Sequence, residues 1–273
     1  MKIEQAKQIA NKAIEHLSQA LERGQTETLK NYLAAIARFH RYSLRNVMLI
    51  ATQNPTASHV AGYNAWRTLG RFVKKGEQGI LILAPIVRAK DSSSEQTETD
   101  ESSTPVGFRA AYVFDISQTD GKELPQLNSV NGDPSEYRER LGKLVAELGI
   151  VLEYSEDIAP AHGRSAGGKI TLLPGQSPAE DFATLAHELA HEMLHRDERR
   201  AQTTKRLRET EAEAVSFVVC SGIGLETGSA AQDYIQLYEG DAKLLTESLG
   251  HIRQTATRIL NAIGAEETSA PTA

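Results

Sequence analysis

Residues Thr184–His195 read TLAHELAHEMLH and contain the pattern His-Glu-x-x-His at positions 187–191. Residues four apart lie one above the other on a helix, so the imidazoles of His187 and His191 can reach the same metal ion. Glu188 can then act as a general base toward a water at that metal. Apolar residues recur here at three- and four-residue spacing, and residues 177–180, Ser-Pro-Ala-Glu, form a capping box with proline at the first helical position. The sequence therefore predicts a buried helix that carries two metal ligands and a base.

A catalytic site with two histidines needs a third protein ligand. The sequence predicts a second helix from about Lys205, which reads RLRETEAEAVSFVVCSGIGL. On this helix Glu209 and Glu213 lie four residues apart on one face and can point at the first helix, whereas Glu211 is rotated by about 200° from Glu209. Helical phase favours Glu209 as the third ligand and leaves Glu211 as the alternative.

The sequence HELAH followed by Glu-x-x-Ala-Glu on the next helix resembles the gluzincin arrangement of thermolysin and of the ImmA/IrrE-type metallopeptidases. The resemblance implies that Glu209 is the ligand and that Glu213 supports a ligand histidine, fixing its tautomer. The 19 residues between His191 and Glu211 match thermolysin better, which keeps Glu211 open. The implied cofactor is Zn²⁺, with Mn²⁺ as the alternative, because two histidines, a carboxylate and water accommodate either.

Other histidines and the single cysteine are expected to have different roles. His195 repeats the four-residue step but lies about 12 Å along the helix from His187, so it is expected to face solvent or to support a ligand. His162 and His251 are candidates for oxyanion stabilisation. Cys220 falls on the apolar face of the second helix and is expected to be a buried structural thiol.

The charge of the chain is unevenly distributed. Residues 1–90 carry 14 Lys and Arg against 5 Asp and Glu, a net +9, while the rest carries 16 against 31, a net −15. This split indicates two parts with different partners, a polyanion for the first. A single cysteine excludes an internal disulfide and favours a reducing cytoplasm. The chain has no apolar run that predicts a membrane span, and its first residues resemble an amphipathic helix rather than a signal peptide.

The expected fold is α+β in two domains, and a polar acidic stretch marks an insertion in the first. Residues 91–104, DSSSEQTETDESST, are expected to form a disordered loop between strands at 79–85 and 108–114. Two helices, at about 2–22 and 26–38, are expected to open the chain.

The first domain is expected to cover residues 1–126 and the second residues 127–265, with a flexible tail at 266–273. A helix over 134–148 is expected to open the second domain. Residues 163–174 predict a glycine-rich turn and a strand, which either borders the cleft and pairs with an extended substrate or lies inside a sheet.

Basic and aromatic residues are interleaved in the first domain. Cations can follow the phosphates of single-stranded nucleic acid while flat rings stack on unpaired bases. The alternative is that the aromatic residues belong to the core and the cations form a solvated face. The candidate DNA-binding residues are Arg41, Tyr42, Arg45, Trp66, Arg71, Lys74 and Lys75.

Several motifs in this half closely resemble the N-terminal domain of ArdC-type antirestriction proteins. They are Tyr42-Ser43-Leu44-Arg45-Asn46, Gln53-Asn54-Pro55, Trp66, Leu69-Gly70-Arg71, Val73-Lys74-Lys75-Gly76-Glu77 and Phe114-Asp115-Ile116-Ser117-Gln118-Thr119. With the HELAH helix, the resemblance covers about residues 5–225. It implies a helical and β-sheet domain that binds single-stranded DNA, joined to a zincin-like metallopeptidase domain, in a protein of mobile elements that protects incoming DNA from restriction. The alternative function is a zinc endopeptidase that cleaves a repressor or regulator, with the first domain binding protein.

Overall fold

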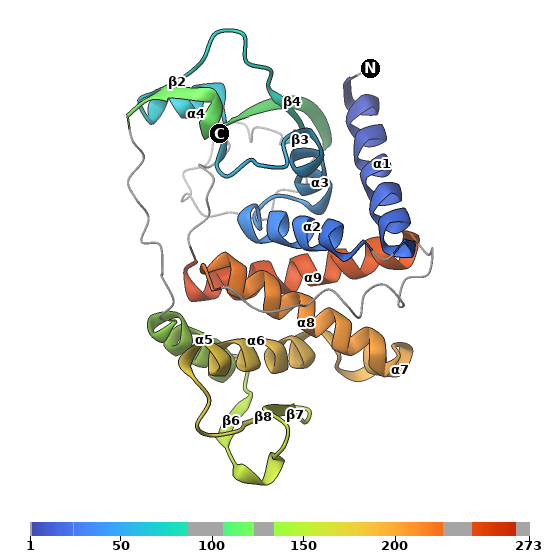
Figure 1. Cartoon of the computed structure of the whole chain (residues 1–273), viewed down its shortest axis with the longest axis vertical. Helices are drawn as coiled ribbons and strands as arrows, with labels where there is room; N and C mark the ends of the chain where they lie inside the picture. Colours follow the sequence, from blue (N-terminus) through green and yellow to red (C-terminus); the bar gives the residue numbers. More distant parts are fainter. Residues whose placement is uncertain (1, 24, 87–105, 123–133, 226–241, 266–273) are drawn as a thin grey trace, which may run out of the picture.

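The computed structural model describes residues 2–23, 25–86, 106–122, 134–225 and 242–265. Within them the protein has the α+β architecture expected from the sequence, with long helices and three small sheets (Figure 1). The acidic loop expected at 91–104, the boundary expected at residue 126 and the expected tail lie outside the described residues. These three expectations stay predictions.

The N-terminal part packs three helices against a three-stranded antiparallel sheet. The helices are α1 (Lys2–Glu22), α2 (Thr26–Arg38) and α3 (Leu44–Gln53), and the sheet has the order β1 (Val60–Gly62), β4 (Gly107–Asp115), β3 (Ile80–Ile86). Both helices expected at the start of the chain are confirmed, as are the two strands expected on either side of the acidic stretch. Ile80 pairs with Val113 and Ile86 with Gly107, so β3 and β4 form one long hairpin ladder.

Two amide side chains from α3 bind the edge of β3. Asn46 accepts the backbone N–H of Leu83 at 2.9 Å and donates to the carbonyl of the same residue at 2.9 Å. Gln53 makes the equivalent pair of bonds with Leu81, at 3.0 and 2.9 Å. The two amides are seven residues apart and project from one face of the helix, where they meet alternate residues of the strand. They therefore satisfy backbone groups that a neighbouring strand would otherwise pair.

A second small sheet follows, and hydrogen bonds to Asp115 connect the segments between the two sheets. It pairs β2 (Arg71–Val73) with β5 (Thr119–Gly121), and α4 (Tyr63–Thr68) precedes β2. Asp115 Oδ1 accepts the backbone N–H groups of Ser58 and His59 at 2.8 and 3.1 Å, and Oδ2 accepts that of Ser117 at 3.0 Å. Burial by itself would raise the pKa of Asp115, but these hydrogen bonds outweigh it and lower the pKa.

The C-terminal part combines helices with a small mixed sheet. Its elements are α5 (Ser135–Glu147), β6 (Val151–Tyr154), β7 (Gly163–Ser165), β8 (Lys169–Leu172), α6 (Pro178–Leu194), α7 (Asp197–Gln202), α8 (Lys205–Gly222) and α9 (Ala242–Ile263). The strand order is β6-β8-β7, with β6 parallel and β7 antiparallel to β8. The helix expected over 134–148 is confirmed as α5. The glycine-rich segment forms two strands where one was expected: β7 lies at an edge of the sheet and β8 inside it.

One hydrophobic core runs through both parts of the described chain. It includes Leu33 and Ile36 of α2, Val215 of α8 and Ile252 of α9, all fully buried. Helix α8 packs against α2, and α9 contacts α1 of the N-terminal part as well as α5 and α8 (Figure 1). The α9 residues Arg253 and Thr257 donate to the carbonyls of Tyr42 and His40, at 3.2 and 2.7 Å. The two parts are therefore joined by packing and by hydrogen bonds. No helix of the described residues is long and apolar enough to cross a membrane.

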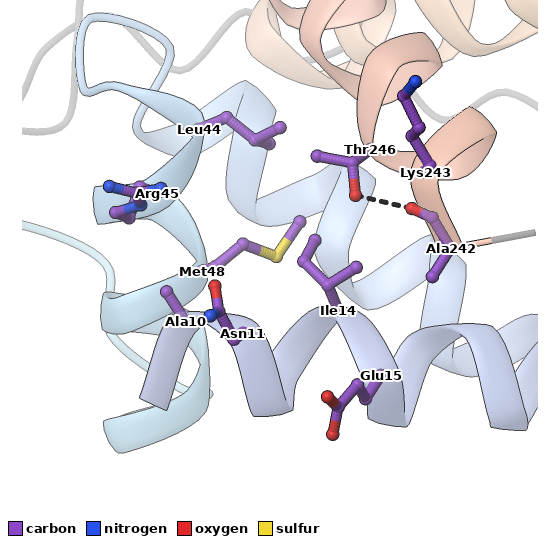
Figure 2. A pocket seen from close by; sticks show the side chains of 10 residues that line it. All are labelled: Ala10, Asn11, Ile14, Glu15, Leu44, Arg45, Met48, Ala242, Lys243 and Thr246. Atoms are coloured by element: carbon purple, nitrogen blue, oxygen red, sulfur yellow. Dashed lines mark hydrogen bonds between the residues drawn. The ribbon is translucent and has the colours of Figure 1, made fainter. Parts of the chain in front are cut away.

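A cavity of about 480 Å³ lies where α1 and α3 meet α9. Figure 2 shows the side chains that line it. Ile14, Leu44 and Met48 line it with apolar side chains, and Arg45 and Lys243 lie on its two sides. Its lining residues come from these three helices alone, so the cavity is separate from the histidines of α6.

Candidate metal centre

Helix α6 begins with the predicted capping box. Ser177 Oγ accepts the backbone N–H of Glu180 at 3.3 Å, and the Glu180 carboxylate accepts that of Ser177 at 3.0 Å. The apolar face of α6 is buried and includes Phe182, Leu185, Ala186, Leu189 and Ala190. Packing of this face fixes the rotation of α6 about its axis, so the histidines between these residues meet α8 in defined positions.

Three side chains bring their donor atoms together between α6 and α8. His187 Nε2 and His191 Nε2 are 3.1 Å apart, and Glu209 Oε2 is 3.7 and 3.5 Å from them. Four ligands placed tetrahedrally about 2.05 Å from a zinc ion would be about 3.4 Å apart. The observed separations lie on either side of that value. Two imidazoles and one carboxylate are also a donor set that Zn²⁺ and Mn²⁺ accept, so the residues fit a divalent metal.

The electrostatics of this cluster favour a cation. Burial by itself would lower the pKa of His187, but the carboxylates of Glu209 and Glu213 raise it to about 9. In turn, the neighbouring imidazoles of His187 and His191 lower the pKa of Glu209. Without a metal, the cluster therefore holds a proton at neutral pH, and a bound metal ion would have to displace it.

The two other glutamates of α8 point in different directions. Glu213 Oε2 is 3.4 Å from His187 Nδ1, the nitrogen on the side of the ring away from the donor cluster. Glu211, the alternative ligand, is buried and outside the cluster, and its Oε2 is 2.9 Å from His195 Nε2. The opposite directions of Glu209 and Glu211 agree with the helical phase of the sequence.

His195 is part of a buried polar network. Its side chain is in contact with His191, at 3.0 Å between the two Nδ1 atoms, and only 2% of the residue is exposed. Burial lowers the pKa of His195, although the neighbouring Glu211 carboxylate acts in the opposite direction. Of the two expectations for His195, exposure to solvent is wrong, whereas its contact with His191 agrees with the alternative that it supports a ligand histidine.

Glu188 lies under the edge strand β7. The backbone N–H of Ser165 donates to its carboxylate, and burial raises its pKa. A Cβ atom on Gly163 would lie 2.8 Å from Glu188 Oε1 and 2.6 Å from Thr184 Cγ2, closer than side chains approach. Glycine at position 163 is therefore what lets β7 approach the HExxH helix closely.

Glu192, which the sequence analysis did not single out, attaches the β7–β8 turn to α6. Its carboxylate accepts the backbone N–H groups of Gly167 and Gly168 at 2.9 and 2.7 Å and pairs with Arg196. Both glycines have positive φ, 60° and 95°. The Gly-Gly pair in the sequence indicates such a turn, but the sequence does not say which acid it would bind.

The remaining candidates of the C-terminal part lie outside the donor cluster. His162 is exposed and contacts Gln176, at 3.3 Å between Nδ1 and Oε1, and His251 is exposed on α9. Neither contacts the donor cluster in the way that an oxyanion donor would require, so their role in oxyanion stabilisation stays a prediction. Cys220 is buried, and burial raises the pKa of its thiol to about 12, as expected for a structural cysteine.

Three candidate DNA-binding residues make packing contacts or hydrogen bonds within the N-terminal part. Trp66 is 1% exposed and donates from Nε1 to the carbonyl of Phe114 at 2.8 Å, so its ring cannot stack on a base. Tyr42 is half-buried and packs edge-to-face on Phe39. Arg71 donates to the hydroxyl and carbonyl of Thr119 at 2.8 and 3.0 Å, joining β2 to β5. The prediction that Trp66 contacts DNA is wrong, because the indole belongs to the core.

The other four candidates, Arg41, Arg45, Lys74 and Lys75, are exposed. Two aromatic residues outside the candidate set are exposed near the two lysines: Tyr63 at 51% on α4 and Phe72 at 58% on β2. In the sequence these exposed rings stand close to buried ones, as Tyr63 does to Trp66. Only the packing distinguishes an exposed aromatic residue from a buried one. The α4–β2 segment lies at the opposite end of the long axis from β6–β8 (Figure 1).

The fold and the site define an α+β protein in which a helix-and-sheet part is joined to a part with an HExxH helix and a convergent glutamate. Residues 4–114 match the family model described as the N-terminal domain of anti-restriction factor ArdC. The chain is thus ArdC-like over its N-terminal part, and the match ends before the HExxH helix.

Two crystal structures of the antirestriction protein ArdC from plasmid R388 share the overall fold. The metal-free structure has a TM-score of 0.50 and 22% identity, over 82% of this chain and 85% of that one. The Mn(II)-bound structure also has a TM-score of 0.50, with 20% identity, over 85% and 97% of the two chains. At these identities the likeness concerns the fold alone.

One protein relative is longer than this chain. The uncharacterized protein pXO2-81 of Bacillus anthracis is 24% identical over 276 aligned residues, which cover 84% of this chain and 46% of that protein. The chain thus spans about half the length of the relative.

Proposed function

We propose that the protein binds single-stranded DNA through the surface around α4 and β2, binds a divalent metal at His187, His191 and Glu209, and acts in antirestriction for a mobile element in the cytoplasm. The observation that carries the metal proposal is the separation of the three donor atoms, 3.1 to 3.7 Å. The antirestriction role is supported by the ArdC match of residues 4–114 and by the fold that the chain shares with ArdC of plasmid R388.

In this proposal each residue of the centre has a distinct role. His187, His191 and Glu209 hold the metal, either Zn²⁺ or Mn²⁺, and the Mn(II)-bound ArdC structure supports the second choice for the related protein. Glu213 accepts a hydrogen bond from His187 Nδ1 and thereby orients that ring. The metal, when bound, supplies a Lewis acid that polarises an oxygen ligand. Glu188 is the proton acceptor, and its burial raises its pKa toward the range in which a carboxylate both takes and returns a proton.

Single-stranded DNA is proposed as the partner because exposed rings and cations occur together on α4, on β2 and directly after β2. Tyr63 and Phe72 offer rings to unpaired bases, and Lys75 offers charge to phosphates. Lys74 adds charge beside it, although its ammonium group also donates to the carbonyl of Ser117 at 3.0 Å and lies 3.7 Å from Asp120. The net +9 of residues 1–90 supplies a field of the same sign around them. Arg41 and Arg45 are exposed in the same half of the chain and extend this charge.

The DNA proposal is tested by anisotropy titration of a labelled oligo(dT) at several salt concentrations. Phe72→Ala should weaken binding by about 1–3 kcal/mol without changing the salt slope. Lys75→Ala should reduce the slope of log K against log salt by about 0.7, because one phosphate contact is lost. Lys143→Ala, an exposed lysine on α5, is the matched control and should change neither quantity. Equal affinity and slope in all four proteins would refute this surface.

A second candidate function is a zinc endopeptidase that cleaves a protein such as a repressor. The observation in its favour is the edge strand β7 beside Glu188, because an extended peptide can pair with a free strand edge. Glu188→Gln should keep metal affinity and DNA affinity but abolish cleavage. Mass spectrometry of host proteins incubated with each form separates the functions. Peptides that appear with the wild type and not with Glu188→Gln support the peptidase, and identical digests refute it.

A further inference from the structure

We infer that His195 and Glu211 are positioning residues that hold His191 in the tautomer whose Nε2 atom is free to bind a metal. The inference rests on the metal site proposed above and deepens it. It concerns hydrogen bonds within this chain, which exist whether or not an ion is bound. A chain of contacts through four helices carries it.

The chain begins at the metal ligand and ends at a buried carboxylate. His191 Nε2 belongs to the donor cluster, and its other nitrogen, Nδ1, is 3.0 Å from His195 Nδ1. His195 Nε2 is 2.9 Å from Glu211 Oε2. The second oxygen, Oε1, accepts from Arg199 Nη2 and from Ser248 Oγ, each at 2.8 Å. His195 and Glu211 are 2% and 1% exposed, so water does not compete for these bonds.

The Glu211 carboxylate, at which the chain of hydrogen bonds ends, determines which atom donates in each bond. An ionised carboxylate only accepts, and Arg199 and Ser248 occupy its other oxygen as donors. His195 must therefore carry its proton on Nε2 to bond Glu211. In its neutral form this leaves a lone pair on His195 Nδ1, and His191 has to donate its Nδ1–H to it. The lone pair of His191 is then on Nε2, the atom that faces His187 and Glu209.

A purely structural His195 would fill space without setting a proton position, and one isosteric change distinguishes the two roles. In Glu211→Gln the amide oxygen remains the acceptor for Arg199, because guanidinium has no acceptor of its own. The amide NH₂ then faces His195 Nε2 and donates to it. The bonds reverse along the chain: His195 Nδ1 becomes the donor, and His191 carries its proton on Nε2. The shape of the core is conserved while the metal-binding lone pair is lost.

The test uses the full chain with ¹⁵N-labelled histidine, free of metal, and long-range ¹H–¹⁵N correlation spectra. We expect the wild-type His191 to be protonated on Nδ1 and the Glu211→Gln variant to be protonated on Nε2. The Mn²⁺ affinity of the variant, measured by calorimetry, should fall 10- to 100-fold, as for other outer hydrogen-bond partners of ligand histidines. Asp181→Asn is the matched control, since Asp181 pairs with Arg138 on α5 and not with the histidines. It should keep the wild-type tautomer and Mn²⁺ affinity.

Two results would overturn the inference: wild-type His191 protonated on Nε2, or a folded Glu211→Gln variant with an unchanged His191 tautomer. If that variant does not fold, the wild-type spectrum alone decides. The metal proposal fails separately. A wild-type protein that binds neither Mn²⁺ nor Zn²⁺ but protonates His191 on Nδ1 refutes the metal site and supports the hydrogen-bond chain.

Discussion

The polar residues of the N-terminal motifs and those of the α6–α8 pair differ in where their functional atoms point. Asn46, Gln53 and Asp115 bind backbone groups of their own fold and have little left to offer a ligand. His187 and Glu209, by contrast, direct their atoms at one another across a gap of 3.7 Å. Distinctive sequence motifs therefore mark two different things in this chain. In the first part they specify an architecture, and in the second they assemble a site.

The largest effect should come from breaking the site. His191→Ala removes one of three proposed ligands, and we expect metal affinity to fall on the order of a thousandfold or more, about 4 kcal/mol. Without metal the variant should unfold cooperatively, because α6 keeps its apolar face. Calorimetric titration with Mn²⁺ and thermal melts with and without metal measure both. His16→Ala, on α1, is the control and should bind metal like the wild type. Retained affinity in His191→Ala would contradict the assigned ligands.

The next largest effect should come from removing Asp115, and it should appear in the free energy of unfolding rather than in metal affinity. Asp115→Ala leaves the backbone N–H groups of Ser58 and His59 without their acceptor. At about 1–3 kcal/mol for each unsatisfied buried group, the free energy of unfolding should fall by about 3 kcal/mol. Chemical denaturation measures it, with the exposed Asp120→Ala as the control. Metal affinity per folded molecule should stay unchanged, and a loss of it would show that Asp115 influences the metal centre through the core that the two parts share.

Asp115 also predicts a pH dependence of stability. Its pKa is lowered in the folded protein, so its charged form is stabilised by folding. This contribution is fully present above the ordinary aspartate pKa of about 3.9 and is lost as the pH falls through the lower folded value. Asp115→Asn should therefore reduce stability at pH 7 and flatten its decline in acid. An acid decline equal to that of the wild type would contradict the assignment.

Metal binding should depend on pH near neutrality, whereas the effect of Asp115 on stability appears in acid. His187 has a pKa raised to about 9 without metal, so below that pH a proton competes with the ion. The apparent Mn²⁺ affinity should rise by about tenfold per unit between pH 6 and 8 for each proton released. Glu213→Gln removes one of the carboxylates that raise this pKa, and the rise should move to lower pH. Calorimetry in buffers of different ionisation enthalpy counts the protons. A pH-independent affinity would contradict the coupling.

The smallest effect should come from the edge of β3. Gln53→Ala removes two hydrogen bonds to Leu81, and we expect a loss of about 1–2 kcal/mol in the free energy of unfolding. Asn46→Ala, which is more buried, should cost slightly more. Asn31→Ala on the exposed face of α2 is the matched control. Equal stability of all three variants would show that water replaces the amides on the strand.

Predictions from the sequence were most accurate where a short periodic pattern determines the local geometry. The four-residue step of His187 and His191 and the capping box of α6 are local, so a helix was enough to place them. The same local rule separated Glu209 from Glu211, because two residues on a helix turn by about 200°. Local patterns could not place Trp66, and they left two alternatives open for His195, because the burial of both residues depends on elements distant in sequence.

Sequence alone thus determined five of the helices (α1, α2, α5, α6 and α8), the strands β3 and β4, the α+β class and the residues able to form a metal site. Each of these follows from backbone periodicity or from the chemistry of neighbouring residues. Only the tertiary structure decided which aromatic rings are exposed, that Asn46 and Gln53 bind the edge of β3, and that Glu211 of α8 and Ser248 of α9 support the histidines of α6. The physical reason is that burial and hydrogen-bond partners arise from packing between segments up to 217 positions apart, as for His40 and Thr257.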